Sequence, residues 1–360
     1  MKIALVFDGA SALGARPDLL ILETVEEVEH ILATEGNQVV RIPVHGDGRW
    51  IERIRRGKFD LAFNLCEGID GVATLEPAVI SVLELLEVPY TGASSWTAAL
   101  CLRKHLVNGL LERSGIPIPR FLVARRTAHG ALGRLPSVGF PAICKPAAED
   151  ASLGVEQRSV VRTARALAER VTAMHERWDE VLVQRFVDGR EVNVGILGDE
   201  TLPIAEIAFD AMPKGMWRIV SYRSKWETGS DEDVGAQPRC PADLDPALTA
   251  ELKRLALAAW RAVGGESAGY GRVDFRIDRA GRPWLLEVNS NPDLAPDAGL
   301  ARMARAAGLD YGALVRSLCQ RALLRREAPA ADRWTLAQRL SGVADDGDAD
   351  ALDLFAFAPQ

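Results

Sequence analysis

Two apolar strands joined by a short turn limit the fold of this chain more than any other stretch does. GRVDFRID and PWLLEVNSN are separated only by residues 279–282, Arg-Ala-Gly-Arg. A turn of this length makes consecutive strands antiparallel neighbours. Side chains alternate between the two faces of a strand, so each strand is predicted to have one apolar and one polar face. The pattern predicts a hairpin within a sheet.

The polar face of this hairpin is a candidate metal site. Asp274 on the first strand and Glu287 and Asn289 on the second are predicted to face one place. Their oxygen atoms are ligands that suit magnesium held together with substrate phosphates. The alternative is a solvated sheet face on which Arg272 and Arg276 pair with the carboxylates, and the hairpin alone does not decide between the two.

The first part of the chain alternates strand and helix signals. Apolar runs at 2–7, 38–42 and 59–65 are separated by helical stretches at 19–34 and 74–86, and a short strand is expected at 88–90. This order is typical of a parallel α/β sheet. We predict a first domain over residues 1–95.

The rest of the chain is predicted to form two more domains and a tail. A helix over 96–113 leads into strands and a helix that make a small domain up to residue 187, and a larger domain containing the hairpin follows over 188–328. The chain is long enough for more than one core. Residues 329–360 include the acidic stretch ADDGDAD and are expected to be disordered.

Composition excludes several classes of protein. The net charge is -7 and the basic residues are scattered rather than clustered, so a nucleic-acid-binding protein is not expected. No apolar run reaches the roughly 20 residues that span a bilayer, and the N-terminus becomes polar too early for a signal peptide, so we expect a cytoplasmic protein. The five cysteines are widely spaced and indicate neither disulfides nor a zinc site.

Three lysines favour the metal interpretation of the hairpin. Lys145 ends the apolar strand PAICKPA, Lys104 lies on the helix CLRKHLVNGLL, and Lys225 lies in the polar segment SYRSKWETGSDED. Each alone is most simply a surface residue. Several cations together with a metal site are, however, typical of a site that binds nucleotide phosphates.

The chain resembles the ATP-grasp superfamily, and within it the D-alanine:D-alanine ligases, over about residues 1–325. The resemblance is carried by six stretches that occur in the family's order: FDLAFNLCEG, VPYTGASSWTAALCLRK, GFPAICKPAAEDASLG, EVLVQRFVDGREVNVGILGDETLP, YRSKW and GYGRVDFRIDRAGRPWLLEVNSNPDL. It implies an ATP-grasp fold, α/β and in part α+β, with an N-terminal parallel α/β domain. No Walker-type phosphate loop is present.

The resemblance also implies roles for individual residues. The roles are phosphate binding by Lys104, Lys145 and Lys225, adenine and ribose binding by Gln184 and Glu191, two magnesium ions (or manganese) on Asp274, Glu287 and Asn289, and catalysis by Arg272, Lys225 and Ser152. The implied reaction transfers a phosphoryl group from ATP to a carboxylate, and an amine then attacks the acyl phosphate. The substrates would be small carboxylates and amines such as amino acids or peptides, and the protein would be a homodimer.

Several substrate-binding positions depart from the family pattern. SALGARPDL lacks the expected glutamate, Trp226 replaces a tyrosine, Asp150 and Ala151 replace a glycine and a serine, and Ala298 replaces a serine. We therefore expect a ligase for substrates other than two D-alanines. Asp293 and Asp297 would favour a cationic acceptor, unless they only cap a helix.

Three alternatives stay open at this point. The chain could be a genuine D-alanine:D-alanine ligase. It could be a catalytically silent nucleotide-binding regulator on the same fold, although the complete set of lysine, arginine and carboxylate residues argues against this. The tail could also serve as a docking peptide through its end, LDLFAFAPQ.

Overall fold

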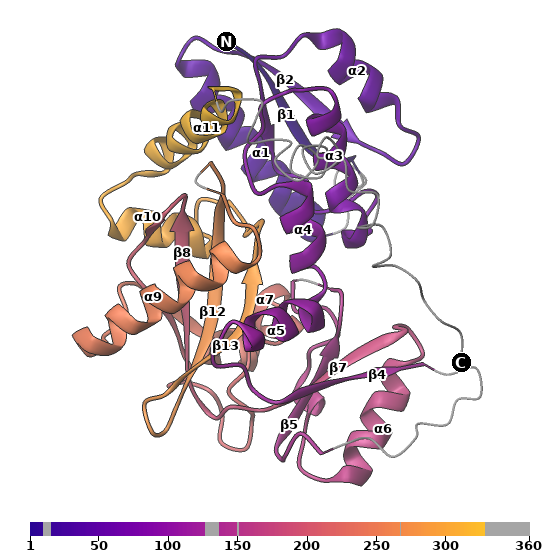
Figure 1. Ribbon diagram of the computed structural model, residues 1–360, viewed down its shortest axis with the longest axis vertical. Coiled ribbons are helices and arrows are strands. Elements are labelled where there is room, and N and C mark those ends of the chain that lie inside the picture. Colours follow the sequence, from indigo (N-terminus) through magenta and orange to yellow (C-terminus); the bar gives the residue numbers. More distant parts are fainter. Residues whose placement is uncertain (10–15, 127–136, 150, 267, 328–360) are drawn as a thin grey trace, which may run out of the picture.

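The computed structural model describes residues 1–9, 16–126, 137–149, 151–266 and 268–327. Three sheets organise this part of the chain, and Figure 1 shows them as an N-terminal layer, a large central sheet and a small sheet. The predictions for residues 10–15 and for the tail lie outside the described residues. Within the described residues, no helix has the length and apolarity needed to cross a membrane.

The N-terminal sheet is parallel, with strand order β2-β1-β3. Its elements are β1 (Lys2–Asp8), α1 (Arg16–Thr34), β2 (Gln38–Val44), α2 (Arg49–Gly57), β3 (Leu61–Asn64), the 3-10 turn η2 (Ala73–Leu75) and α3 (Glu76–Leu85). The alternation of strand and helix in the sequence predicted this arrangement. The strand expected at 88–90 is only a single parallel bridge between Tyr90 and Ala62, because Pro89 has no N–H to continue a ladder.

Two short helices connect the N-terminal sheet to the rest, where one helix was predicted. They are α4 (Ser95–Cys101) and α5 (Lys104–Arg113). The break falls at Leu102 and Arg103, and the backbone N–H of Lys104 then donates to the carbonyl of Ala147 at 3.1 Å. An unbroken helix would direct this N–H to its own preceding turn, so the break ties α5 to the small sheet.

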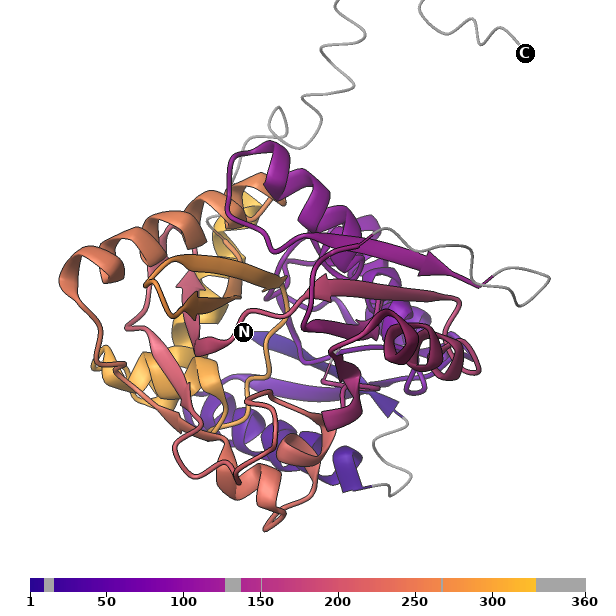
Figure 2. The same ribbon diagram turned by 90° about the horizontal axis from the view of Figure 1, so that it is seen from below.

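The small sheet is antiparallel and has the order β4-β7-β5-β6. Its elements are β4 (Phe121–Arg125), β5 (Ala142–Pro146), the 3-10 turn η3 (Gln157–Ser159), β6 (Val160–Val161), α6 (Ala164–Met174) and β7 (Glu180–Arg185). Helix α6 covers one face with Leu167, Val171 and Met174. The view from below separates this unit from the large sheet and α9 (Figure 2).

The large sheet has the order β11-β10-β8-β12-β13, and β9 pairs with β8. Its strands are β8 (Gly189–Leu197), β9 (Glu200–Thr201), β10 (Ala205–Ala208), β11 (Gln237–Arg239), β12 (Tyr270–Asp278) and β13 (Pro283–Asn289). The helices are α7 (Tyr222–Trp226), α8 (Asp231–Gly235), α9 (Pro246–Ala262), α10 (Gly299–Ala306) and α11 (Tyr311–Glu327). The predicted hairpin is therefore the β12-β13 edge of this sheet.

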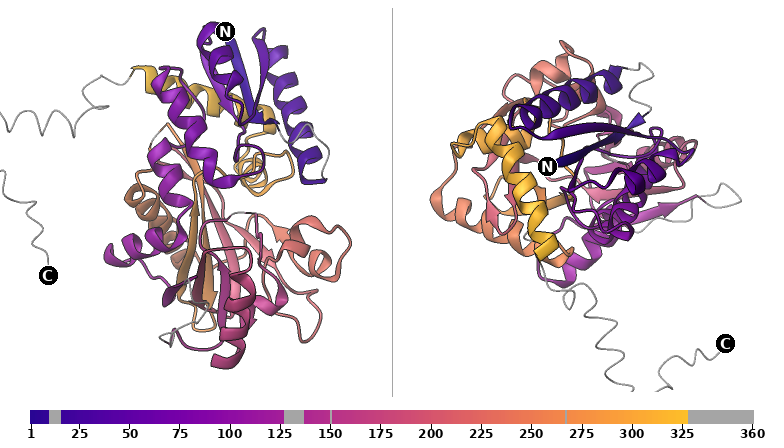
Figure 3. Two further views of the ribbon diagram at one scale, coloured as in Figure 1. Left: turned by 90° about the vertical axis from the view of Figure 1, so that its right-hand side faces the viewer. Right: turned by 90° about the horizontal axis from the view of Figure 1, so that it is seen from above.

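Helix α11 returns to the N-terminal sheet. Its Leu314, Val315 and Leu318 are buried in one cluster with Ile3 and Leu5 of β1. Figure 3 shows α11, in yellow, lying beside the N-terminal strands. The end of the described chain and its beginning thus share a core, which fixes the N-terminal sheet against the large sheet.

Candidate functional site

The hairpin brings the predicted oxygen ligands together. Asp274 of β12 pairs directly with Glu287 of β13, and Arg272 pairs with Asn289. On its other side Asp274 is opposite Asn193 of β8. A bulge between Asp274 and Phe275 shifts the register so that Phe275 faces Leu285. The three oxygen-bearing side chains therefore occupy adjacent positions on neighbouring strands.

Arg272 and Asp274 form a two-point ion pair on this face. The Nε and Nη2 atoms of Arg272 donate to Oδ1 and Oδ2 of Asp274 at 2.7 and 2.8 Å, and Nδ2 of Asn193 donates to Oδ1 at 2.7 Å. Burial alone would lower the pKa of Arg272, but Asp274 and Glu287 raise it above its ordinary value. Arg272 is thus a fixed cation with part of its charge already compensated.

Four cations surround Glu287. Nζ of Lys104, at the start of α5, lies 3.8 Å from Oε2 of Glu287. Burial would raise the pKa of Glu287, but Lys104, Lys145, Arg272 and Lys225 hold it well below its usual range. We call these five residues the Glu287 cluster. Its members come from α5, β5, β12, β13 and α7, so these predicted site residues lie near one another although they are far apart in the sequence.

The small sheet and the loop that follows β5 position two lysines of this cluster. Lys104 also donates from Nζ to the carbonyl of Glu149 at 2.5 Å. Lys145 lies near the end of β5, and burial lowers its pKa, while Glu287 raises it and Lys104 lowers it further. Close positive charges without enough carboxylate are costly to bury. The cluster is therefore suited to a polyanion.

The loop after β5, which we call loop 147–157 and of which residue 150 is not described, contacts Lys104 through the carbonyls of Ala147 and Glu149. Ala151 and Ser152 have φ angles of 55° and 60°, in the left-handed region that non-glycine residues rarely occupy. Gly154 also has a positive φ, of 73°, and a Cβ at this residue would lie 2.6 Å from the ring of Trp178. The Ser152 hydroxyl donates to the carbonyl of Val220 at 3.1 Å, so it contacts the segment that carries Lys225.

That segment, which we call segment 217–235, contains helices α7 and α8. Lys225 is exposed, whereas Glu232 is buried at 2% exposure and accepts from the Ser221 hydroxyl at 2.6 Å. Nε1 of Trp226 donates to the carbonyl of Ala151 at 3.0 Å. The predicted phosphate-binding lysine therefore lies on a segment bonded to loop 147–157.

The predicted base and ribose residues lie on β7 and β8. Gln184 is 1% exposed, and among the described residues its Nε2 atom has no hydrogen-bond partner. A buried amide without a partner is costly, which fits a position completed by a ligand. Glu191 is bound by Arg276, with Nη2 2.7 Å from Oε2. Burial raises the pKa of Glu191, and Arg276 opposes that rise.

The sequence suggested only one role for Arg276, which was to pair with the hairpin carboxylates on a solvated sheet face. It is 3% exposed, it also donates to the carbonyls of Gly189 and Arg218, and its guanidinium lies over Phe186 at 5.4 Å and Phe209 at 5.3 Å. The alternation of side chains along β12 predicted that Arg276 lies on the same face as Asp274. Its partner, Glu191 of β8, follows only from the strand order.

The structure after β13 contradicts the alternative interpretation of two aspartates as helix caps. Helix α10 has Ala298 at its N-cap, and no side chain caps it. The interpretation of Asp293 and Asp297 as caps of this helix is therefore wrong. Oδ1 of Asp293 instead accepts from the backbone N–H of Ala295 at 2.8 Å, and the residue is exposed.

Asn291 is a site residue that the sequence reasoning missed. Its backbone N–H donates to Oδ1 of Asn289 at 2.9 Å. Its side chain donates to the carbonyl of Cys66 at 3.1 Å and accepts from the Tyr270 hydroxyl at 3.1 Å. Asn291 thus connects a predicted metal ligand with the loop after β3, and no local sequence pattern indicates a bond across 225 residues.

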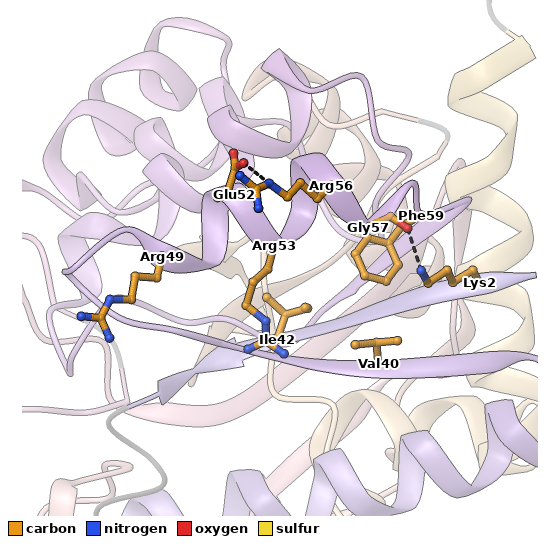
Figure 4. Close-up of a pocket in the computed structure, with 9 residues that line it drawn as sticks. All are labelled: Lys2, Val40, Ile42, Arg49, Glu52, Arg53, Arg56, Gly57 and Phe59. Atoms are coloured by element: carbon orange, nitrogen blue, oxygen red, sulfur yellow. Dashed lines mark hydrogen bonds and ion pairs between the residues drawn. The ribbon is translucent and has the colours of Figure 1, made fainter.

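A separate surface hollow of about 480 Å³ lies on the N-terminal sheet (Figure 4). Its charged groups already have partners: Glu52 binds Arg55 and Arg56, and Nζ of Lys2 donates to the carbonyl of Gly57 at 2.8 Å. It contains none of the predicted site residues. The Glu287 cluster, with its convergent charges, is the stronger candidate for a functional site.

Known proteins are similar to this chain over most of its length. The family model described as "D-ala D-ala ligase C-terminus" matches residues 110–320. A D-alanine–D-alanine ligase of Alkalilimnicola ehrlichii is 36% identical over 278 residues, which are 75% of this chain and 80% of that protein. An uncharacterized protein of Sinorhizobium fredii is 31% identical over 259 residues, or 72% of this chain and 73% of the relative.

Solved structures show the same fold. The D-alanine–D-alanine ligase of Bacillus anthracis superposes with a TM-score of 0.73 at 23% identity, over 91% of this chain and 99% of that one. The same enzyme complexed with ATP gives a TM-score of 0.72 at 21% identity.

The three sheets have the fold of these ligases, and the family model and the relatives identify the chain as an ATP-grasp ligase. Such an enzyme uses ATP to form a carbon–nitrogen bond. The chain belongs to the D-alanine–D-alanine ligase family.

Proposed function

We propose that this ligase joins a carboxylate to an amine through an acyl phosphate, and that its substrates differ from two D-alanines. The observation that carries the proposal is the Glu287 cluster, in which Lys104, Lys145, Lys225 and Arg272 surround one ionised carboxylate. Four cations exceed the combined charge of this carboxylate and of Asp274, which pairs with Arg272. The surplus suits the phosphates of ATP and the negative charge that develops during phosphoryl transfer.

In this proposal Gln184 and Glu191 bind the base and the ribose. The buried Nε2 of Gln184, which lacks a partner among the described residues, supports a ligand at that position. Arg276 orients the Glu191 carboxylate at 2.7 Å, and its oxygens would accept from ribose hydroxyls.

The chemistry of the donor set fits magnesium, which would be held by Asp274, Glu287 and Asn289. All three provide hard oxygen atoms. Within the described residues, no three His, Cys, Asp or Glu side chains gather as a metal site, so in this proposal the amide oxygen of Asn289 would complete the set. Asp274 already accepts three hydrogen bonds, and a carboxylate offers about four acceptor positions. When bound, the metal would supply positive charge that neutralises phosphate charge.

Arg272, Lys225 and Ser152 complete the proposed machinery. Arg272 would stabilise charge on the reacting carbonyl from its fixed position beside Asp274. Lys225 would reach the terminal phosphate from segment 217–235, and Ser152 would hold this segment to loop 147–157 through its bond to Val220. The chain's own task is positioning and charge compensation, because phosphoryl transfer needs little covalent help from the protein.

The acceptor is proposed to be a cationic amine. Asp293 is exposed beside the hairpin and helps raise the pKa of Arg272, so its negative charge reaches the site. A carboxylate at this place would bind a second ammonium group on the acceptor. A genuine D-alanine–D-alanine ligase remains the second candidate, because several relatives carry that name.

The test is magnesium-dependent release of ADP from ATP across a panel of amino acids, dipeptides and polyamines, with the products identified by mass spectrometry. Stimulation by a pair that contains a cationic amine is the expected result. Efficient turnover with D-alanine alone would overturn the substrate proposal and establish the second candidate. Tight ATP binding without ADP release for any pair would instead support a silent regulator.

A further inference from the structure

The hollow on the N-terminal sheet carries more positive than negative charge. Among the described residues that line it, four are cations, namely Lys2, Arg49, Arg53 and Arg56, and one, Glu52, is a carboxylate. The chain as a whole has a net charge of -7, so this surface is positive on a protein that is negative overall. We call it the basic hollow.

The partners of these cations do not balance their charge. Nζ of Lys2 and Nη2 of Arg53 donate to backbone carbonyls, which carry no net charge. Arg56 shares the carboxylate of Glu52 with Arg55, and the Arg56 side chain is 76% exposed. Exposed ion pairs of this kind contribute little free energy, so the guanidinium groups can bind another anion.

The floor of the basic hollow is apolar. Figure 4 shows Val40 and Ile42 of β2 beneath α2, with Arg53 extending from the helix toward Ile42. At the other end, Nζ of Lys2 lies 5.2 Å from the centroid of the Phe59 ring. The volume of about 480 Å³ is within the range of ligand pockets, roughly 300 to 1,000 Å³. A fitting ligand would combine apolar groups with several negative charges.

The last residues of the sequence, 344–360, have this composition. They read ADDGDADALDLFAFAPQ and lie outside the described residues. They contain no lysine or arginine, and their five aspartates are Asp345, Asp346, Asp348, Asp350 and Asp353. Leucine and phenylalanine side chains alternate with or follow the last of these. We call this stretch the acidic segment, and its charge is complementary to that of the basic hollow.

The chain between α11 and the acidic segment is long enough to reach the hollow. Helix α11 packs on the face of the N-terminal sheet that carries Ile3 and Leu5, whereas the hollow lies on the opposite face, with Ala4 and Val6. A path around the sheet passes two helix layers and is about 30 Å long, because a helix is about 10 Å across. Residues 328–343 can span up to roughly 50 Å.

Attachment to the same chain makes even a weak contact effective. A segment within reach of its site has an effective concentration on the order of 1 mM, so a contact with a Kd of about 1 mM is formed about half of the time. A free anion of the same affinity would need a millimolar concentration to compete. The chain's own segment is therefore the favoured occupant.

We propose that the basic hollow is the docking site of the acidic segment of the same chain. The aspartates lie against Lys2, Arg53 and Arg56, and the leucine and phenylalanine side chains cover Val40 and Phe59. Docking attaches the end of the chain to the face of the N-terminal sheet opposite α11, and it closes the hollow to other anions.

The test is photo-cross-linking of the full chain with p-benzoylphenylalanine in place of Phe357. After irradiation at low ionic strength and digestion, mass spectrometry identifies the peptides that are joined to the acidic segment. The expected partners are peptides from residues 38–60, which include α2 and most of the hollow. Equal amounts of isotopically light and heavy chains are mixed first, and the expected links join only peptides of the same isotope.

Two variants test the charge complementarity. Arg53→Glu should lower the yield of this cross-link about fivefold. The matched control is Arg165→Glu on α6, which reverses the charge of an arginine that is 89% exposed and also paired with a glutamate, and it should leave the yield unchanged. Asp345→Asn/Asp346→Asn removes two charges from the acidic segment without changing its size and should act like Arg53→Glu. An increase from about 0.05 M to about 0.5 M salt should weaken the link by a similar factor.

Three results would overturn the docking site. They are cross-links spread over other surfaces, links that join light to heavy chains, and a wild-type yield in both Arg53→Glu and Asp345→Asn/Asp346→Asn. The second variant changes none of the described residues, so it decides the question even if Arg53→Glu does not fold. Cross-linking requires neither ATP nor an amide product, and its result is therefore independent of the proposed ligase reaction.

Discussion

Replacement of Glu287 by glutamine tests the charge balance on which the site depends. Nζ of Lys104 lies 3.8 Å from the carboxylate, and two unit charges at this distance attract by roughly 4 kcal/mol at an effective dielectric constant of 20. The Glu287 side chain is 28% exposed, so solvent screens part of this energy. We therefore expect Glu287→Gln to lose about 2 kcal/mol of unfolding free energy and to remain folded.

Activity should fall much further than stability. Without the carboxylate the proposed magnesium site loses a charged ligand, and the expected decrease in magnesium-dependent ADP release is about a hundredfold. Urea unfolding and initial rates at neutral pH measure the two effects, with Glu200→Gln on the exposed strand β9 as the control. Unchanged turnover in Glu287→Gln would refute the metal assignment, and an unchanged urea midpoint would refute the charge balance.

The pH dependence of this stability difference has a definite sign. The pKa of Glu287 is lower in the folded protein than its ordinary value of 4.5. The carboxylate therefore contributes its full stabilisation above pH 4.5 and loses it as the pH falls through the folded pKa. The difference in unfolding free energy between wild type and Glu287→Gln should shrink in acid, as measured by urea unfolding over a pH series.

Three further variants separate the parts of the site. Lys145→Met should weaken ATP binding at least tenfold, as measured by calorimetry. Burial lowers the pKa of Lys145 below its ordinary value of 10.5 in the folded protein, so the unfolded chain binds more protons as the pH approaches 10.5. The unfolding free energy of the wild type should therefore rise over this pH range, and Lys145→Met should not show this rise. Arg276→Met should lose about 3 kcal/mol in urea unfolding, because it leaves the Glu191 carboxylate buried and unpaired; stability equal to wild type would contradict the role of this ion pair. Asp293→Ser should lower kcat/KM for cationic acceptors about tenfold without changing the KM for ATP, because one charge-assisted contact is removed; an equal loss for neutral acceptors would exclude Asp293 as a selectivity residue.

Much of the fold could be predicted because its patterns are local. Alternation in the hairpin predicted that Asp274, Glu287 and Asn289 are neighbours, and the register agrees. The strand–helix alternation predicted the parallel N-terminal sheet. The break between α4 and α5 was missed because its cause, the bond from the Lys104 N–H to the Ala147 carbonyl, lies in a different part of the chain.

The predicted site differs from the structure mainly in its pairings. Lys104, Lys145, Lys225 and Arg272 do gather around Glu287. The sequence could not show that Arg276 binds Glu191, because this pair depends on β8 lying next to β12. It also suggested that Asp293 and Asp297 cap a helix, whereas the first residues of α10 have no side-chain cap.

Asn291 links the N-terminal sheet region to the hairpin of the large sheet. Its amide binds the Cys66 carbonyl of the N-terminal part, while its backbone binds the predicted metal ligand Asn289. A displacement of the loop at Cys66 is thereby transmitted to the hairpin through two hydrogen bonds. A substitution that distorts this buried loop would reduce magnesium affinity in an assay and would be mistaken for damage to a ligand, although Cys66 itself coordinates nothing in this scheme.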